Sequence, residues 1–390
     1  MPDIQVTFDE LIRDGALEIG DGYRAKNSEL NGHGLPFMRA GNLTNSGWNW
    51  DGLERFESDL TSSLASKVSR PGDTVITTKG NSVGRSGYVD SDAPQFVYSP
   101  HLSFWRAKKP EKVAPRFLRY WAMSPEFLNQ LRALGHGTDM APYLSLSDQR
   151  RLRVSLPETG TQEAIGDLLG ALDDKIAVND RIVSTSQELM VSHYKRGVAR
   201  GARRVPLGEA ASFSNSQRIP LSSREREARP GPYPYYGAAG VVGYVHDFIF
   251  SGPRLLVGED GSVITPEGRP VTQYVWGEFW VNNHAHVLTG TAISTELLSI
   301  AMHFTNVAAL VTGAVQPKLS MSNLRRLEVP IPEPEEVTQL EAVCGAIYEL
   351  VRSRTGESRH LNELRDTLLP ELMSGRLRVK DAEKVVEKAV

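Results

Sequence analysis

One short stretch occurs twice in this chain of 390 residues, and this internal repeat constrains the fold more than any other feature. LSLSDQRRLRVSLP begins at Leu144, and LSMSNLRRLEVPIP begins 175 positions later, at Leu319. The shared residues are Leu144, Ser145, Ser147, Arg150, Arg151, Leu152, Val154 and Pro157, which recur as Leu319, Ser320, Ser322, Arg325, Arg326, Leu327, Val329 and Pro332. The chain therefore contains two copies of one structural unit, in agreement with a length too great for a single core.

A long amphipathic helix is predicted after each copy, at about residues 161–195 and 335–369, because apolar residues recur at alternating spacings of three and four. This heptad pattern favours pairing of the two helices. The predicted seam consists of Ile165, Leu168, Leu172, Asn179, Ile182 and Leu189 in the first helix and of Leu340, Val343, Ile347, Leu350, Leu361, Leu364 and Leu368 in the second. The alternative is that each helix packs only on the domain that precedes it.

Polar residues interrupt this seam, with Asn179 in the first helix and Arg354 and Glu357 in the second. Such residues destabilise a plain zipper, but they can fix the register of one particular pairing.

The region before each helix is rich in short β-branched and aromatic runs that Gly, Pro, Asn and Asp separate, which predicts the strands of a mixed α/β domain. The second domain is reached through the Gly- and Arg-rich turn at residues 197–204. The predicted organisation is a first domain at 1–158, a central long helix at 159–200, a second domain at 201–333, a C-terminal long helix at 334–375 and a tail at 376–390.

The composition is that of a soluble globular protein, with 40% hydrophobic and 23% charged residues. A net charge of -3 excludes a uniformly basic protein that coats nucleic acid, although it leaves sequence-specific DNA binding open. Because the sequence has no membrane-spanning apolar run and no secretory signal at its start, we expect a cytoplasmic protein with no membrane partner. The single cysteine, Cys344, excludes an internal disulfide and is expected to pack in a core.

Three further segments are distinctive: LLGALDDKIAVNDRI from Leu168, YYGAAGVVGYV from Tyr235 with the following VGEDGSVI and VNNHAHVL, and LRDTLLPELMSGRLRV from Leu364. All three resemble specificity subunits of type I restriction-modification systems. The likeness covers nearly the whole chain in the order domain, helix, domain, helix. It implies an α/β fold of mixed α+β type, in which two target recognition domains are related by a pseudo-two-fold repeat and joined by two long antiparallel coiled-coil helices.

The resemblance also implies a function. Each target recognition domain would read one half of a bipartite site in double-stranded DNA, and the helices would set the distance between the halves. A helix of about 35 residues spans roughly 50 Å, enough to place two domains about one DNA turn apart. Two DNA adenine methyltransferase subunits, and restriction or translocase subunits in systems that cleave, would dock on this frame.

Catalysis is not expected in this chain. The sequence carries no adenine-methyltransferase tetrad, no glycine-rich cofactor motif after a first strand, no Walker motif and no compact carboxylate cluster. Cofactors are therefore expected only on partner subunits, namely S-adenosylmethionine, ATP and magnesium. Two alternatives remain: a hydrolase with a site around His101 or His284, and a coiled-coil scaffold that binds DNA without sequence preference.

In the first domain, the turn TTKGNSVGRSG from Thr77 to Gly87 combines glycines, which allow close backbone approach, with side chains that suit phosphates or base edges. It differs from a phosphate loop in its spacing and in the strand expected after it. The candidate DNA-binding residues of this domain are Arg39, Asn42, Lys79, Asn81, Ser82, Arg85 and His101. The alternative for the turn is an ordinary exposed hairpin.

In the second domain, VGEDGSVITPEG occupies the corresponding place, and its acidic pair suits cytosine amino groups better than phosphates. The candidate DNA-binding residues are Tyr235, Tyr236, Asp260, Ser262, Asn282, Asn283 and His284. The alternative for the tyrosines is a place in the core. The spacing of His284 and His286 would place both on one strand face, but no third ligand is near enough in sequence to predict a metal site. The repeated arginine pairs, Arg150 with Arg151 and Arg325 with Arg326, either bind phosphates, bind partner subunits or form structural ion pairs.

Overall fold

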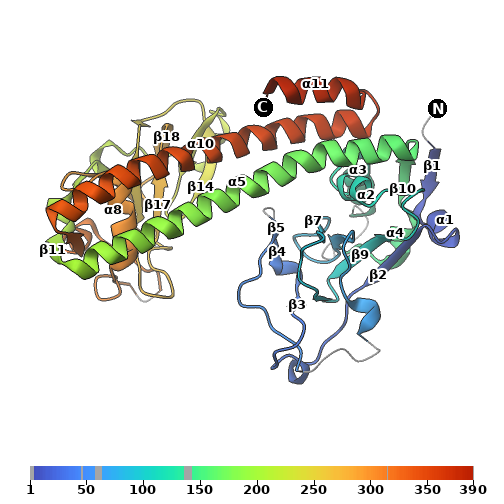
Figure 1. Ribbon diagram of the computed structural model, residues 1–390, viewed down its shortest axis with the longest axis horizontal. Coiled ribbons are helices and arrows are strands. Elements are labelled where there is room, and N and C mark those ends of the chain that lie inside the picture. The colour runs from blue at the N-terminus through green and yellow to red at the C-terminus, as the bar shows by residue number, and fades with distance from the viewer. Residues whose placement is uncertain (1–3, 45–46, 58–63, 136–142, 314, 390) are drawn as a thin grey trace. The chain divides into compact units, whose positions relative to one another are not determined.

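The computed structural model describes residues 4–44, 47–57, 64–135, 143–313 and 315–389 (Figure 1). The chain forms two compact units, and each long helix contributes a part to both. Unit 1 comprises residues 1–177 and 358–390, and unit 2 comprises residues 178–357. Each unit is described by itself.

Unit 1 is built on a four-stranded antiparallel sheet. Its strands, in spatial order, are β2 (Leu17–Asp21), β9 (Leu102–Ala107), β6 (Thr74–Thr77) and β7 (Ser86–Tyr88). Smaller pairings are β1 (Ile4–Thr7) with β10 (Arg153–Leu156), β3 (Phe37–Met38) with β8 (Val97–Tyr98), and β4 (Leu43–Thr44) with β5 (Gly47–Trp48). Its short helices are α1 (Phe8–Arg13), α2 (Pro115–Trp121), α3 (Pro125–Gly135) and α4 (Leu146–Arg151), and α11 (Val379–Ala389) follows the second long helix.

Unit 2 repeats this architecture. Its four-stranded antiparallel sheet has the order β12 (Ala211–Phe213), β19 (Ala285–Gly290), β16 (Arg254–Gly258) and β17 (Thr272–Val275). A second four-stranded sheet has the order β14 (Val241–Val245), β13 (Tyr233–Tyr236), β18 (Glu278–Val281) and β15 (Phe250–Ser251), in which β13 and β18 run parallel. A separate antiparallel pair joins β11 (Ala202–Pro206) to β20 (Glu328–Pro332). Its short helices are α6 (Leu207–Ala210), α7 (Ser223–Glu227), α8 (Thr295–Ala301) and α9 (Met321–Arg325). The prediction of two related α/β domains is confirmed.

The repeated sequence forms the same element in both units. Leu144 and Leu319 are buried, and the serine after each caps a short helix: Ser145 Oγ accepts from Asp148 N, and Ser320 Oγ accepts from Asn323 N. The strand that follows the helix pairs antiparallel with the first strand of the unit. The repeated segment thus links the last strand of each domain to its first strand.

The arginine pairs of the repeat have structural partners at three of their four positions. Arg150 lies 3.0 Å from Asp9, Arg151 lies 3.1 Å from Asp148, and the guanidinium of Arg325 lies 4.5 Å from the ring centre of Phe213. These contacts support the interpretation as structural ion pairs in unit 1.

The two long helices are α5 (Thr159–Arg200) and α10 (Pro334–Met373), drawn green and orange to red in Figure 1. They run antiparallel within each unit. In unit 1, Asp173 pairs with Arg365 at 2.7 Å, and the end of α10 joins the same core as Ile165. In unit 2, Arg200 pairs with Glu336 at 2.7 Å. Because the end of α10 is buried in unit 1, the alternative in which each helix packs only on its preceding domain is wrong.

The observed helix seam differs from the predicted one at several positions. Leu189 is 47% exposed, whereas the next residue, Met190, is buried in the core of unit 2. Val343 and Leu350 were likewise assigned to the seam, but they are 39% and 37% exposed. The reason is that each helix packs on its partner helix and also on a globular core, which rotates the buried stripe away from an ideal heptad.

The other predicted seam positions are confirmed as inward-facing. The buried ones are Ile165, Leu172, Asn179, Leu340, Leu361 and Leu368, and the half-buried ones are Leu168, Ile182, Ile347 and Leu364. The polar residues of the seam contact one another, since Asn179 Nδ2 donates to Glu357 Oε2 at 3.1 Å and Arg354 Nη1 donates to the same oxygen at 2.6 Å.

Within the described part of the chain, no helix is long and apolar enough to cross a membrane.

Candidate nucleic-acid interface

Three segments of unit 1 meet at one end of its four-stranded sheet. The backbone N–H of Thr78, directly after β6, donates to the carbonyl of His101 at 2.9 Å. The carbonyl of Thr78 in turn accepts from Leu144 N at 2.9 Å. These bonds bring Lys79, His101 and Tyr143 together, and all three are exposed.

Unit 2 has the same hydrogen-bond frame. Glu259 N, directly after β16, donates to the carbonyl of His284 at 2.8 Å, and the Glu259 carbonyl accepts from Leu319 N at 2.9 Å. The residues brought together are Asp260, His284 and Lys318. His101 is therefore the structural counterpart of His284.

The β6–β7 turn of unit 1 is a hairpin. Gly80 and Gly84 have φ angles of 85° and 86°, a region that favours glycine, and β7 follows as the strand that the sequence predicted. Lys79 and Asn81 are exposed on this turn, and Ser82 is half-buried. These side chains are accessible to a DNA surface.

The side chain of Arg85, on the same turn, contacts another segment of unit 1. Its Nη1 donates to the carbonyl of Leu43 at 2.8 Å, which ties the hairpin to the segment that contains Arg39 and Asn42. Asn42 Oδ1 accepts from Arg39 N at 2.9 Å, and Arg39 Nε donates to Glu54 at 2.6 Å. Arg85, Arg39 and Asn42 thus have structural partners.

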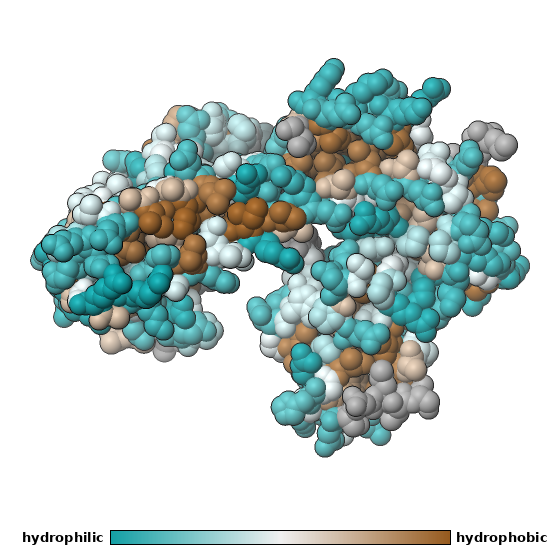
Figure 2. Space-filling view, viewed as in Figure 1, coloured by the Kyte–Doolittle hydropathy of each residue, from teal (hydrophilic) through white to brown (hydrophobic). Residues whose placement is uncertain are grey.

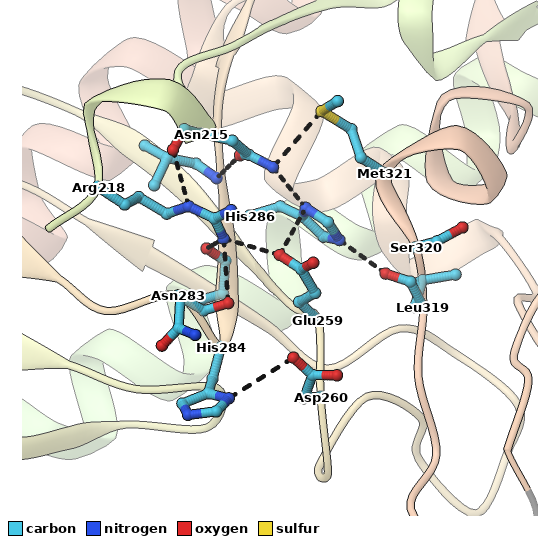
Figure 3. A network of polar contacts seen from close by, with 12 residues as sticks. Asn215, Arg218, Glu259, Asp260, Asn283, His284, His286, Leu319, Ser320 and Met321 are labelled. Carbon is cyan, nitrogen blue, oxygen red and sulfur yellow. Dashed lines mark hydrogen bonds and ion pairs between the residues drawn. The ribbon is translucent and has the colours of Figure 1, made fainter. Parts of the chain in front are cut away.

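The corresponding site of unit 2 is a network of charged groups (Figure 3). Arg218 Nη1 donates to Glu259 Oε2 at 2.8 Å and to the carbonyl of Ala285 at 2.7 Å. Asp260 lies 3.6 Å from His284 Nδ1, as Figure 3 shows, and 3.2 Å from Lys318 Nζ. Two carboxylates and two permanent cations therefore balance one another.

His286 is a buried structural histidine. Its Nε2 lies 2.7 Å from the carbonyl of Leu319, which can only accept, so Nε2 carries a proton and Nδ1 accepts from Asn215 Nδ2 at 2.8 Å. Burial lowers the pKa of His286, which favours the neutral ring. The expectation that His284 and His286 share one strand face is wrong, because His284 precedes β19 in a turn and is 49% exposed while His286 is fully buried.

The two ring nitrogens of His286 are bonded to the side-chain amide of Asn215 and the carbonyl of Leu319, and neither partner is a hydroxyl or thiol that could act as a nucleophile. In the described residues, no group of three or more His, Cys, Asp or Glu side chains is placed to hold a metal ion.

The remaining candidates of unit 2 separate into exposed and structural residues. Ser262 and Asn283 are exposed, whereas Asn282 Oδ1 accepts from His284 N at 2.8 Å and shapes the turn. Tyr235 is 1% exposed and its hydroxyl accepts from Leu221 N at 2.8 Å, so the core alternative holds for this residue. Tyr236 is half-buried, with its ring edge-to-face against Phe279.

Sequence reasoning missed two exposed residues at these sites, Tyr143 and Lys318. Each directly precedes the matching leucine of the repeat, and each faces the second residue after β6 or β16, as the bridges Lys79 to Tyr143 and Asp260 to Lys318 show. Extending the offset of the repeat by one residue toward the N-terminus would have aligned them.

A buried polar group was also missed. Gln149 Nε2 donates to the carbonyl of Leu144 at 3.3 Å, and its Oε1 accepts from Ser103 and Trp105. It satisfies in unit 1 the same leucine carbonyl that His286 satisfies in unit 2. Since the two residues lie on different elements, the repeat gave no signal for this replacement.

Comparison with known proteins places these sites in a family context. A family model described as type I restriction modification DNA specificity domain matches residues 17–184 and 203–343. A putative type I restriction enzyme specificity subunit of Haemophilus influenzae is 32% identical over 146 residues, which are 37% of this chain and 37% of that protein. The EcoprrI specificity subunit of Escherichia coli is 26% identical over 168 residues, 43% of this chain and 40% of that protein. The matched parts thus span about two fifths of the length of these curated relatives.

Among solved structures, the S subunit of a type I restriction-modification system from M. genitalium has a similar fold. The TM-score is 0.57 and the sequence identity 16%, over 95% of each chain.

Proposed function

Because the chain belongs to the type I restriction-modification DNA specificity domain family, we propose that it is the subunit that recognises a bipartite DNA sequence for a modification complex. The family match covers both copies of the internal repeat. In this proposal residues 1–158 and 201–333 are the recognition domains, residues 159–200 and 334–375 are the connecting helices, and residues 376–390 are a tail.

One observation carries the proposal: the two units share a backbone frame at the end of their sheets but present different side chains there. Where unit 1 has Thr78 and Lys79, unit 2 has Glu259 and Asp260. A lysine suits phosphates and guanine, whereas carboxylates suit the amino group of cytosine. Two copies of one frame with different chemistry are suited to reading two different half-sites.

The helix pair supports docking of partner subunits. In unit 2, the apolar residues Val178, Leu189, Val343 and Leu350 are each at least 37% exposed on α5 or α10, and Figure 2 shows apolar surface along this helix pair. Exposed apolar surface that is contiguous commonly marks a protein interface. The proposed partners are two DNA adenine methyltransferase subunits and, in a complex that also cleaves, restriction or translocase subunits.

The proposal assigns no catalysis to this chain. Methylation with S-adenosylmethionine, and any cleavage driven by ATP and magnesium, would take place on the partner subunits. The chain purified alone should neither methylate nor cut DNA when all three are supplied.

The test is to reconstitute the complex and map the modified adenines in a library of random DNA. Modification should occur only at one bipartite sequence and only when this chain is present. Modification without sequence preference would instead favour a non-specific scaffold, and methylation or cleavage by the chain alone would show that it is an enzyme.

A further inference from the structure

Tyr143 and Lys318 occupy the same place in the two units. Each residue directly precedes the buried leucine whose N–H donates to the residue after β6 or β16, and each pairs across an isolated bridge with the second residue after that strand. The two positions differ in chemistry while the leucine and serine that follow them are identical. A position that varies on a repeated frame is suited to recognition rather than to folding.

The ammonium group of Lys318 has a defined place near the surface. Its Nζ lies 3.2 Å from Asp260 Oδ1 and 4.0 Å from Glu259 Oε1. Glu259 is itself held by Arg218 at 2.8 Å, and both carboxylate side chains are less than 20% exposed. The lysine side chain remains 50% exposed. A lysine held in this way loses less side-chain entropy when it forms a further contact.

The charge around Lys318 argues against a simple phosphate contact. A phosphate binds most strongly to positive charge that no nearby carboxylate neutralises. Here the negative charges of Glu259 and Asp260 neutralise the positive charges of Lys318 and Arg218. An ammonium group with three donors and no acceptor instead complements neighbouring neutral acceptors. Guanine offers two such acceptors, N7 and O6, side by side in the major groove, whereas adenine places an amino donor next to N7.

We propose that Lys318 reads a guanine in the half-site bound by unit 2 and that Asp260 is a positioning residue for its ammonium group. This inference rests on the proposed function. In unit 1 the same place carries Tyr143, which is 62% exposed beside a polar cavity of about 220 Å³ that Thr78, Ser103 and Gln149 help to line. Tyr143 has a phenol where Lys318 has an ammonium group, so the two half-sites should differ at this position.

The test uses the full complex with its methyltransferase subunits and the sequence profile of modified sites. K318Q should lower the preference for guanine at one position of one half-site by about 5-fold to 150-fold, the range for loss of one base-reading contact. K318R should retain guanine, since arginine donates to the same two acceptors. D260N should weaken the guanine preference without changing which base is preferred.

K79Q in unit 1 is the matched control, because it removes the exposed lysine at the end of the other sheet and should leave the guanine position unchanged. The inference is overturned if K318Q leaves the profile unchanged or if the wild-type profile of that half-site contains no guanine. It is also overturned if K318Q weakens binding to all DNA sequences alike and lowers the magnitude of the slope of log affinity against log salt concentration by about one, as loss of a phosphate contact would. A wild-type complex without sequence preference would contradict the proposed function itself, whereas a specific wild type with an unchanged K318Q profile would contradict only the role of Lys318.

Discussion

Replacement of Leu172 by alanine, compared with the same change at Leu189, separates the observed helix seam from an ideal heptad. Both leucines lie on α5 at predicted seam positions, but Leu172 is 3% exposed in the core of unit 1, whereas Leu189 is 47% exposed. A buried leucine truncated to alanine loses its transfer free energy and leaves a cavity, at a cost of about 2–5 kcal/mol. A surface substitution typically changes the free energy of unfolding by less than about 0.5 kcal/mol.

The assay is thermal and denaturant unfolding of the two variants beside the wild type. At roughly 2–4 °C per kcal/mol for a unit of this size, L172A should lower the melting temperature of unit 1 by about 6–12 °C for a loss near 3 kcal/mol. L189A should stay within about 2 °C of the wild type. Equal losses in the two variants would show that the heptad frame, and not the observed burial, describes the seam.

Two further predictions concern buried charges and pH. The fully buried side chain of Asp73 accepts hydrogen bonds from Arg106 at 2.6 and 2.7 Å and from the hydroxyl of Tyr98. In denaturant unfolding, D73N should therefore destabilise unit 1 by about 3–5 kcal/mol, and Y98F should cost less. Equal losses in the two variants would indicate that the ion pair contributes little. Because burial lowers the pKa of His286 below its ordinary value, the unfolded chain binds this proton more readily, and the stability of unit 2 should fall as the pH drops below about 6.5. H286Q should reduce that pH dependence in melting experiments from pH 5 to 8, and an unchanged dependence would assign it to other groups.

Much of the fold could be predicted from the repeat and its periodicity. The offset of 175 residues fixed the correspondence of Leu144 with Leu319, and the structure shows why this segment is repeated: it caps a helix and closes each domain. The long helices follow from heptad spacing. The pattern did not reveal which neighbour each turn contacts, so Leu189 was assigned inward although Met190 is buried instead.

The candidate site was harder to predict, because exposure depends on contacts between distant segments. Arg85 and Tyr235 had the chemistry of DNA contacts, but Leu43 and Leu221 occupy their polar groups. Neither partner is near in sequence. Lys318 was missed for the opposite reason, since it becomes part of the site only through its bridge to Asp260.

The most direct test of the central claim is whether the two units read separate halves of one target. N81A changes an exposed residue on the hairpin of unit 1, and N283A changes an exposed residue beside His284 in unit 2. In the reconstituted complex, sequencing of modified adenines should show relaxed base choice in one half of the target for N81A and only in the other half for N283A, by about 1–3 kcal/mol per contact. Equal loss at every position of both halves would contradict the account, because these loops would then hold the DNA backbone without specifying its sequence.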